Sequence, residues 1–409
     1  MKQLARNARE GADALYRLSD KRLKILLSAI CQKLSCHQES ILEQNQKDVQ
    51  NARSNGMSAL RLQRLTLSPI ALEKTIGQIQ QLAEQSDLVN VNVREWKLLG
   101  NMAAAQKRIP LGAIAAVFES RPTASLEIMA LCLRTGNSCI LRSGSELLKT
   151  NREIVTLTQT ALRECGLSEK TVQLMEDCGE EALCRLMQRQ ELDLFLARGS
   201  QKLISLFQEN AKVPWICLGP GNCHVYVDAA AKLDMAVEII STAKSKPLLY
   251  NSVETVLVHQ KIAAEFIPRL ISHSSSQGIT LRGCPKSCQL SADIQPISKW
   301  EYATEANDFV LKIKVVDNLE QAAAHIKHFG SGHSEAIVTE SSVAAERFTD
   351  MVDAGVVYVN ASTRFTDGVS LGLGMEGGIS TQKLHTRGPV TVEALTTWKY
   401  IVQGCGNTR

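Results

Sequence analysis

The residues most suggestive of covalent chemistry lie in segment 243–259, which has the sequence AKSKPLLYNSVETVLVH. The segment begins as the end of an amphipathic helix, is interrupted at Pro247 and continues into the β-branched run Val253 to Val258. A tight loop between a helix and a strand can hold one side chain over a cleft. The side chain presented here is that of Tyr250, with Asn251 next to it. A phenol has a pKa near 10 and is only about 0.1% ionised at pH 7, so Tyr250 needs a strongly perturbed environment to act as a nucleophile.

Three polar loops in the first half of the chain could bind an anion. Each follows a predicted strand and combines an arginine or a glycine–serine pair with the start of a helix, where backbone N–H groups and the helix dipole favour negative charge. Taken singly, each loop is explained by helix capping, and Ser143 and Glu146 have the spacing of a capping box. None of the three carries a dinucleotide or P-loop fingerprint, but together they favour a nucleotide. The loops are Glu119-Ser120-Arg121-Pro122, Arg142-Ser143-Gly144-Ser145 and Arg198-Gly199-Ser200.

The second half of the chain supplies amides, a hydroxyl and cations on or beside loops. One interpretation is a solvated basic edge. The other is a pocket for a small anionic substrate, in which an arginine binds a carboxylate or phosphate through two hydrogen bonds. Spacing alone does not separate the two interpretations. The residues are Lys244, Lys246, Asn251, Asn360, Thr363 and Arg364.

Composition narrows the classes of function. A chain of 409 residues suits two or three domains, and its formal net charge of +4 comes from dispersed Lys and Arg, which argues against nucleic-acid binding. Apolar runs reach only about ten residues, so no membrane span is expected. Residues 1–35 do not resemble a signal peptide, so the twelve cysteines are expected to be free thiols in a reducing cytoplasm. Cys284 and Cys288 lack a second ligand pair, so no metal site is expected.

The elements that must position these residues are helices first and then alternating strands and helices. Residues 1–90 show apolar side chains at helical spacing and are predicted to be helical throughout. Beyond residue 108 the alternation is typical of βαβ units and a parallel sheet. The predicted strands of this first set are 114–118, 138–142, 172–175, 192–197, 213–218 and 223–227, and the predicted helices include 125–134, 180–188 and 201–210.

A second α/β set follows the first. Region 272–300 has little pattern and is predicted to hold loops and an edge hairpin. The predicted helices are 232–244, 319–329 and 342–352, and the predicted strands are 253–258, 310–316, 335–338 and 356–360. The ligand-binding loops of an open α/β sheet lie at the carboxyl ends of its strands, where the three polar loops of the first set fall.

Long motifs are spread through the chain: ESRP at 119–122, GNSCILRSGSE at 136–146, LDLFLARG at 192–199, GPGNCHVYVDAAAKLDMA at 219–236, HIKHFGSGHSEAIVTE at 325–340, VYVNASTRFTDG at 357–368 and GLGMEGGISTQKLHTRGP at 372–389. They resemble the gamma-glutamyl phosphate reductases, also called glutamate-5-semialdehyde dehydrogenases, of the aldehyde dehydrogenase superfamily. The resemblance runs from about residue 10 to the C-terminus, and its long C-terminal motifs are highly specific.

The resemblance implies an aldehyde-dehydrogenase-like fold of two open, mostly parallel α/β domains and a small oligomerisation element. Residues 1–230, with part of 366–395, are expected to form the N-terminal helices and the cofactor domain, 231–365 the catalytic domain and 396–409 an oligomerisation tail. The implied reaction is the NADPH-dependent reduction of L-glutamyl 5-phosphate, an acyl phosphate, to L-glutamate 5-semialdehyde in proline synthesis. A cytoplasmic homo-oligomer coupled to the glutamate kinase of the pathway is also implied.

In this family a cysteine thiolate attacks the acyl phosphate, and the resulting thioester accepts hydride. Anchoring the family pattern A-K-T-Q-R-P-x-x-C-N-x-x-E-T on Pro247 and Asn251 places Tyr250 at the cysteine position, with one residue missing before Pro247. Three hypotheses follow. Tyr250 acts as the nucleophile, as tyrosine does in sialidases, or Cys223 acts instead. Alternatively, the chain is an inactive relative that binds nucleotide or glutamyl phosphate and acts through a protein partner.

The resemblance also assigns roles to the polar residues. Thr123 replaces a usual Asn after ESRP, and Phe329 replaces a usual His or Tyr. Glu305, nine residues before Lys314, matches an acidic position that could bind the nicotinamide ribose. The implied substrate residues are Glu119, Ser120, Arg121, Asn222, His333, Asn360 and Arg364, beside the catalytic pair Tyr250 and Asn251. The implied cofactor residues are Arg142, Ser143, Gly144, Ser145, Arg198, Gly199, Ser200 and Glu305.

Overall fold

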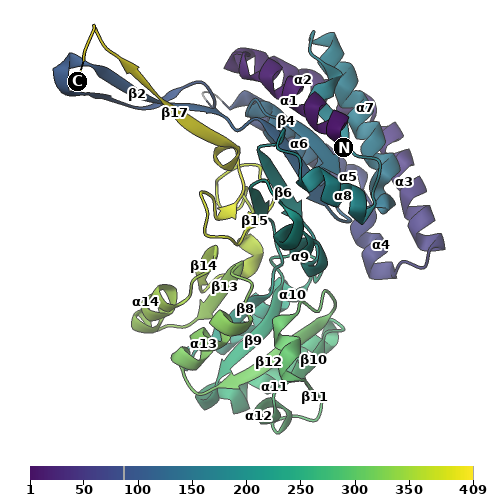
Figure 1. Ribbon diagram of the computed structural model, residues 1–409. Coiled ribbons are helices and arrows are strands. Elements are labelled where there is room, and N and C mark those ends of the chain that lie inside the picture. Colours follow the sequence, from purple (N-terminus) through teal and green to yellow (C-terminus); the bar gives the residue numbers. More distant parts are fainter. Residues whose placement is uncertain (86–87, 409) are drawn as a thin grey trace. The chain divides into compact units, whose positions relative to one another are not determined.

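The computed structural model describes residues 1–85 and 88–408, which form two compact units (Figure 1). The chain passes from the first unit to the second after Leu218 and crosses between them three more times near its C-terminal end, so neither unit is one continuous segment. The first unit is Met1–Leu218, Gly372–Gly378 and Val390–Arg409, and the second is Gly219–Leu371 and Ile379–Pro389. None of the described helices is long and apolar enough to cross a membrane.

Helices open the first unit. Leu23, Leu27, Ile30 and Leu34 lie on one face of α2 and are at most 1% exposed, as their helical spacing predicts. The helical character predicted for residues 1–90 is confirmed as far as Glu84, with short breaks between helices. Residues 86 and 87 lie outside the described residues, and 88–90 are not helical. The five helices are α1 (Lys2–Tyr16), α2 (Asp20–Cys36), α3 (Gln38–Ser54), α4 (Ala59–Leu65) and α5 (Pro69–Glu84).

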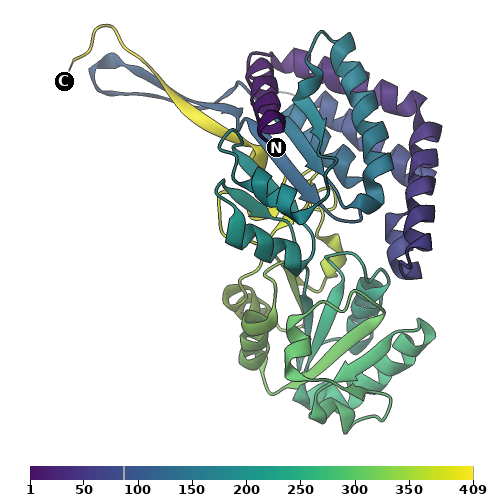
Figure 2. The same cartoon turned by 45° about the vertical axis from the view of Figure 1, so that its right-hand side comes forward.

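A five-stranded parallel sheet follows, in the order β5-β4-β3-β6-β7. Alternate residues of its central strand β3 enter different cores. Ile114 and Ala116 pack with α2, α5, α6 and α7, whereas Ala115 and Val117 pack with α1, α8 and α9. The sheet is therefore covered on both faces, as Figure 2 also shows. The elements are β3 (Ala113–Phe118), α6 (Ala124–Arg134), β4 (Ser138–Arg142), α7 (Leu148–Glu164), β5 (Val172–Leu174), α8 (Glu180–Met187), β6 (Leu194–Arg198), α9 (Gln201–Asn210) and β7 (Trp215–Cys217).

The C-terminal segment is a strand of a second, antiparallel sheet in the same unit. In this sheet β2 (Ala103–Pro110) lies between β1 (Asn92–Lys97) and β17 (Thr396–Gln403). Figure 1 shows β2 and β17 running away from the helices of the unit. The sequence predicted a tail at 396–409 but neither of the other two strands of this sheet. Pairing of β17 with β2 joins residues almost 300 positions apart in the chain, which local periodicity does not encode.

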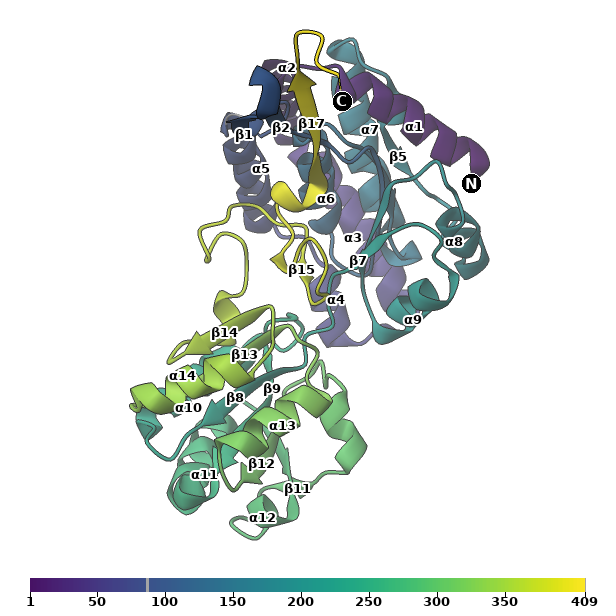
Figure 3. The ribbon, with the colours of Figure 1, turned by 60° about the vertical axis from the view of Figure 1, so that its left-hand side comes forward.

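The second unit is built on a seven-stranded sheet in the order β11-β10-β12-β9-β8-β13-β14, whose pairs are all parallel (Figure 3). One core lies between the sheet and α10 and α11, and another between the sheet and α13 and α14. Its elements are β8 (Cys223–Val227), α10 (Leu233–Lys244), β9 (Val253–His259), α11 (Gln260–Ser276), β10 (Thr280–Gly283), α12 (Pro285–Cys288), β11 (Gln295–Pro296), β12 (Val310–Val316), α13 (Leu319–Phe329), β13 (Ser334–Val338), α14 (Ser342–Met351) and β14 (Val356–Val359). The short strands β15 (Ile379–Ser380) and β16 (Gly388–Pro389) also belong to it.

Two sequence-based expectations change here. Strand 223–227 was placed in the first set, but β8 pairs with β9 and β13, so the division between units falls after Leu218 rather than at 230. The edge hairpin predicted within 272–300 is wrong. The helix α12 separates β10 from β11, and this crossover lets the two strands pair in parallel. The two open, mostly parallel α/β domains expected from the sequence are confirmed.

Candidate active site

The loop between α10 and β9 holds Tyr250 as the sequence predicts. Two turns shape it: the Leu249 N–H donates to the Lys246 carbonyl at 3.2 Å, and the Ser252 N–H donates to the Leu249 carbonyl at 2.8 Å. The Tyr250 ring lies against Gly219, where an added Cβ would be 3.6 Å from the ring. At Gly221 an added Cβ would lie 1.6 Å from the Tyr250 carbonyl oxygen, so only glycine fits there. The glycine-rich loop, residues 219–222, and Tyr250 therefore pack against each other.

Asn251 and Arg364, far apart in the sequence, meet beside Tyr250. The Asn251 amide nitrogen donates to the backbone carbonyls of Arg364 and Thr366, both at 3.1 Å. The Arg364 guanidinium donates in turn to the Asn251 side-chain oxygen, and the Thr363 hydroxyl donates to the Asn251 carbonyl at 2.7 Å. Burial lowers the pKa of Arg364 from its ordinary value, yet an arginine stays charged at neutral pH. A cation is thus held beside the loop that carries Tyr250.

Cys223 also contacts the Tyr250 backbone, and His333 lies next to Cys223. The Cys223 Sγ is 3.3 Å from the Tyr250 carbonyl oxygen, to which it donates, and 3.8 Å from His333 Nδ1. Both residues are at most 1% exposed. Burial, followed by the charge of Glu335, raises the pKa of Cys223 well above its ordinary value. The thiol is close to the loop but is held protonated, which disfavours the thiolate needed for attack.

Three buried charges lie on the elements that flank the loop and on the neighbouring strand β12; the sequence singled out Lys244 but not Glu254 or Lys312. Lys244 Nζ lies 2.8 Å from Glu254 Oε1, and Lys312 Nζ lies 3.7 Å from Glu254 Oε2. All three side chains are at most 3% exposed. Burial lowers the pKa of Lys312 to about 8, against the opposing effect of Glu254. Glu254 and Lys312 interrupt apolar strands, and that interruption was the available sequence signal.

Hydrogen bonds of Asn222 and Glu305 hold the glycine-rich loop in place. The Asn222 amide nitrogen donates to the carbonyls of Tyr302 and Phe329, both at 2.7 Å, and Lys312 donates to its oxygen at 3.3 Å. The Gly221 N–H donates to Glu305 Oε1 at 2.8 Å. The structure thus brings Asn222, Glu305 and His333 to the loop that carries Tyr250.

Asn360 does not join this group. It follows β14 at the carboxyl end of the sheet, whereas Tyr250 and His333 precede β9 and β13 at the amino end. Its side chain accepts from the Thr339 N–H and donates to the Thr339 carbonyl, both at 2.9 Å. The sequence motif does not reveal this difference. The loop that begins at Asn360 returns from the carboxyl end of the sheet to the amino end, where Arg364 meets Asn251 and Thr366 meets Ser334.

The three polar loops of the first unit converge at the carboxyl ends of β3, β4 and β6. The Ser200 N–H donates to Glu119 Oε2 at 2.7 Å, which joins the β3 and β6 loops. The Ser120 N–H and hydroxyl donate to Glu146 Oε1 at 3.1 and 2.8 Å, which joins the β3 and β4 loops. The predicted Ser143–Glu146 capping box is therefore not formed. Glu146 is used between loops, and Ser143 Oγ donates to the Gly144 carbonyl at 2.9 Å.

Arginines line the same loops. Arg121 donates to Glu127 at 2.9 Å, and Arg198 lies 3.6 Å from Glu127 and donates to the Gly377 carbonyl at 2.9 Å. Although burial by itself raises the pKa of Glu127, Arg121 and Arg198 bring it below its ordinary value. Arg142 donates to the Cys178 carbonyl, and its buried Nε atom has no hydrogen-bond partner among the described residues. A guanidinium N–H that lacks a hydrogen-bond partner at the carboxyl end of a parallel strand is suited to bind the phosphate of a dinucleotide.

Glu119, which the resemblance assigned to the substrate, lies with Glu146 among these loops, and both carboxylates fit ribose hydroxyls, which need acceptors. An added Cβ at Gly144 would lie 2.0 Å from Glu146, and one at Gly199 would lie 2.6 Å from Glu119, so the absence of a side chain at both glycines lets the loops lie close together.

Outside these loops, residues 372–377 match the spacing G-x-G-x-x-G, but no strand precedes them and no helix follows, so they are not a dinucleotide fingerprint. No group of three or more potential metal ligands is found in the described parts of the chain.

Comparison with known proteins agrees with this geometry. The model of the aldehyde dehydrogenase family matches residues 2–282. Gamma-glutamyl phosphate reductase of Caldicellulosiruptor bescii is 39% identical over 99% of this chain and 98% of its own length, and that of Carboxydothermus hydrogenoformans is 41% identical over 99% and 98%. The chain belongs to the gamma-glutamyl phosphate reductases of the aldehyde dehydrogenase family. The resemblance drawn from the motifs is confirmed at this level.

Solved structures place the fold in the same family. The crystal structure of gamma-glutamyl phosphate reductase from Thermotoga maritima matches with a TM-score of 0.92 and 37% identity, covering 100% of this chain and 99% of that one. An acetylating aldehyde dehydrogenase from Geobacillus thermoglucosidasius, 17% identical, shares the fold with a TM-score of 0.72. The aldehyde-dehydrogenase-like fold class is confirmed. The family consists of oxidoreductases that use a nicotinamide cofactor.

Proposed function

We propose that this chain is built for the NADPH-dependent reduction of L-glutamyl 5-phosphate to L-glutamate 5-semialdehyde, with release of phosphate. We further propose that Tyr250 stands where the family's cysteine acts, and that this side chain reduces turnover to a negligible level. The observation that carries the proposal is the loop between α10 and β9. It presents Tyr250 beside the Asn251–Arg364 pair, and anchoring the family pattern on Pro247 and Asn251 supports assigning Tyr250 to the nucleophile position.

The position of Arg364 favours the binding of an anionic substrate. Its guanidinium is fixed against Asn251, so it is oriented before a ligand arrives and loses little freedom on binding. A carboxylate or an acyl phosphate can take the remaining donors of the guanidinium. The Asn251 amide nitrogen is already directed at two backbone carbonyls, which keeps the Tyr250 loop in one conformation.

NADPH is the proposed cofactor, and when bound it supplies the hydride. Arg142, with Nε unpartnered, would hold a phosphate, and Glu119 and Glu146 would accept ribose hydroxyls at the ends of β3 and β4. Ser143, Gly144, Ser145, Gly199 and Ser200 would form the backbone of this site, and Arg198 would anchor it to the segment around Gly377. Glu305 lies in the second unit, where it holds the Gly221 N–H.

The chemistry explains why Tyr250 limits turnover. A thiolate attacks an acyl phosphate readily and is a good leaving group afterwards, whereas a phenol with a pKa near 10 is almost fully protonated at pH 7. The phenolic oxygen also stands several ångströms further from the backbone than a cysteine sulfur. Its ring fills the space the acyl carbon would need, and misplacement of about 1 Å can cost about a hundredfold in rate.

The reverse reaction tests this proposal: oxidation of glutamate semialdehyde that depends on NADP and phosphate. We expect negligible activity for the native chain and a gain of about a hundredfold or more for Tyr250→Cys. Robust native turnover that disappears in Tyr250→Phe would show that the phenol is the nucleophile and overturn the proposal. Robust native turnover lost only in Cys223→Ser would point to the buried thiol instead.

Tyr250 itself favours a second candidate function. With the binding loops formed but the nucleophile replaced, the chain would bind nucleotide or glutamyl phosphate and act through a protein partner such as the glutamate kinase of the pathway. Both functions assume that the chain has a nucleotide site. Titration calorimetry with NADPH tests this assumption, because absence of binding at millimolar NADPH would rule out the proposed cofactor site. Inactivity of Tyr250→Cys together with normal NADPH binding would favour the partner function.

The proposal includes a cytoplasmic homo-oligomer. None of the twelve cysteines, all of which lie in the described part of the chain, forms a disulfide, which is typical of a reducing compartment. The antiparallel sheet of the first unit exposes Trp398, Tyr400 and Val402 on β17, as a surface that contacts a second copy would.

A further inference from the structure

The second unit has a hollow at the end of its sheet opposite Tyr250. Its volume is about 490 Å³, within the range of about 300–1,000 Å³ common for small-molecule sites. Lining residues come from four places: the start of α10, the segment after β13, the start of α14, and the end of β14. All lie within the second unit, so the hollow is complete in that unit alone.

The position of the hollow follows from the order of the strands. The neighbouring strands β8 and β13 run in parallel, but the chain leaves β8 through α10, which packs on one face of the sheet, and leaves β13 through α14, which packs on the other. The two connections therefore diverge and leave a crevice outside the carboxyl ends of the two strands. In open α/β sheets this reversal of direction is where ligands bind. The residues around Tyr250 lie at the amino ends of the same strands and leave this crevice unused.

The floor of the hollow is rigid. Thr339 is fixed by the Asn360 side chain on both its N–H and its carbonyl, and its hydroxyl donates to Asp228 at 2.8 Å. Asn360 adopts a φ of 54°, a left-handed conformation uncommon outside glycine. The Glu340 N–H donates to the Ala230 carbonyl at 2.8 Å, which ties the segment after β13 to the one after β8. A floor held this way keeps its shape before a ligand arrives.

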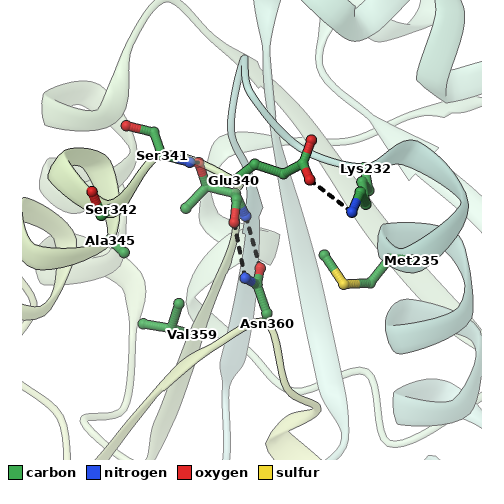
Figure 4. Close-up of a pocket in the computed structure, with 9 residues that line it drawn as sticks. Lys232, Met235, Glu340, Ser341, Ser342, Ala345, Val359 and Asn360 are labelled. Atoms are coloured by element: carbon green, nitrogen blue, oxygen red, sulfur yellow. Dashed lines mark hydrogen bonds and ion pairs between the residues drawn. The ribbon is translucent and has the colours of Figure 1, made fainter.

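The rim carries one charge of each sign. Lys232 Nζ and Glu340 Oε1 are 2.8 Å apart, and their side chains are 66% and 55% exposed (Figure 4). A pair this exposed contributes little to stability, so a ligand can separate it at small cost. Beside it, Ser341 caps α14 through the Ala344 N–H, and the Ser342 hydroxyl lies at the first turn of the same helix, which favours an anion.

Apolar side chains complete the lining. Figure 4 shows Met235 on the α10 side, with Ala345 and Val359 facing it from α14 and β14. The hollow therefore offers a cation and a helix start for a carboxylate, a carboxylate for an ammonium group, and an apolar wall for a short side chain. A doubly charged phosphate matches this lining less well because Glu340 would repel it.

We propose that this switch-point hollow binds a small zwitterionic α-amino acid with a short apolar side chain. Lys232 and the start of α14 hold its carboxylate, Glu340 holds its ammonium group, and Met235, Ala345 and Val359 contact its side chain. The site lies outside the reductase site, and the inference does not depend on the reaction proposed for Tyr250.

Calorimetric titration of the full-length chain tests the inference directly. L-Alanine, L-valine, L-leucine, L-isoleucine and L-proline are titrated at millimolar concentrations, with N-acetyl-L-valine and L-valinamide, which each lack one charge, and inorganic phosphate. We expect at least one free amino acid to bind and each valine derivative to bind about tenfold or more weakly than valine, since each loses one charge-assisted contact. No binding by any amino acid, equal binding of the derivatives, or binding of phosphate alone would overturn the inference.

Variants locate the binding. Lys232→Met and Glu340→Gln each remove one charge, and Ala345→Phe fills the hollow without changing charge; each is expected to weaken binding about tenfold or more. Lys286→Met is the matched control, because Lys286 forms a similarly exposed pair with Asp317 elsewhere in the unit. Thermal unfolding of each variant verifies that it is folded. Unchanged binding in folded Ala345→Phe would show that the amino acid binds elsewhere and would overturn the inference.

Discussion

Two histidine rings, His224 and His325, are enclosed in the second unit with their centroids 5.5 Å apart. His224 Nδ1 lies 3.0 Å from Glu335, and both side chains are fully buried. His325 Nδ1 lies 2.9 Å from Lys314 Nζ and packs against Tyr302 and Phe329. Burial, helped by the charges of His224 and Lys314, lowers the pKa of His325 to about 2. The ring is therefore neutral in the folded protein throughout the ordinary pH range.

This histidine makes stability depend on pH. In the unfolded chain His325 has a pKa of about 6.5, so below that pH the unfolded state binds a proton that the folded state does not. The stabilisation is fully present above pH 6.5 and falls as the pH drops, by up to about 1.4 kcal/mol per pH unit. Urea unfolding between pH 8 and pH 5 measures the slope. In His325→Leu the slope should decrease by that amount, and an unchanged slope would contradict the assignment.

At the scale of elements, α10, β9 and β12 are joined by the buried charges Lys244, Glu254 and Lys312. One carboxylate serves two ammonium groups, and it also accepts the Ala306 N–H at 2.6 Å. The loop that carries Tyr250 connects two of these elements, so the charges fix the angle at which α10 enters the loop. The sequence showed the helix, the loop and the strand, but not that their charges would be buried together.

Removing the shared carboxylate should loosen this junction. We expect Glu254→Gln to lower the free energy of unfolding by about 3–5 kcal/mol, because it leaves two buried ammonium groups without a counter-charge. Glu265→Gln, which removes one partner of an exposed pair with Arg269, should change it by less than about 1 kcal/mol. Chemical denaturation of both variants gives the comparison. Equal, small effects would mean that the junction charges do not support the fold.

At the scale of the whole molecule, the antiparallel sheet of the first unit carries an apolar stripe. Trp398, Tyr400 and Val402 alternate along β17 and share one face, where the Trp96 ring also packs edge-on to Tyr400 at 6.0 Å. Trp398, Tyr400 and Val402 are each more than half exposed. Exposed aromatic and branched residues gathered on one strand face are typical of a surface that contacts another chain.

The proposed homo-oligomer can be tested on this stripe. Trp398→Glu places a charge within this stripe and should shift the molar mass, measured by light scattering after size-exclusion chromatography, from an oligomer to a single chain. Gln403→Glu adds the same charge on the opposite face of β17 and should leave the molar mass unchanged. A native chain that is already monomeric, or an oligomer that survives Trp398→Glu, would contradict the proposed use of this surface.

The sequence by itself determined the alternation of strands and helices, the loop that presents Tyr250 and, through its motifs, the family. These features are local: the spacing of apolar residues sets the element, and a proline, a glycine or a motif sets the turn. Only the tertiary structure decided which sheet receives β8, that β10 and β11 pair in parallel, and that Asn360 lies away from Asn251. These depend on pairings between distant segments, whose free energy comes from burying surfaces that no single segment contains.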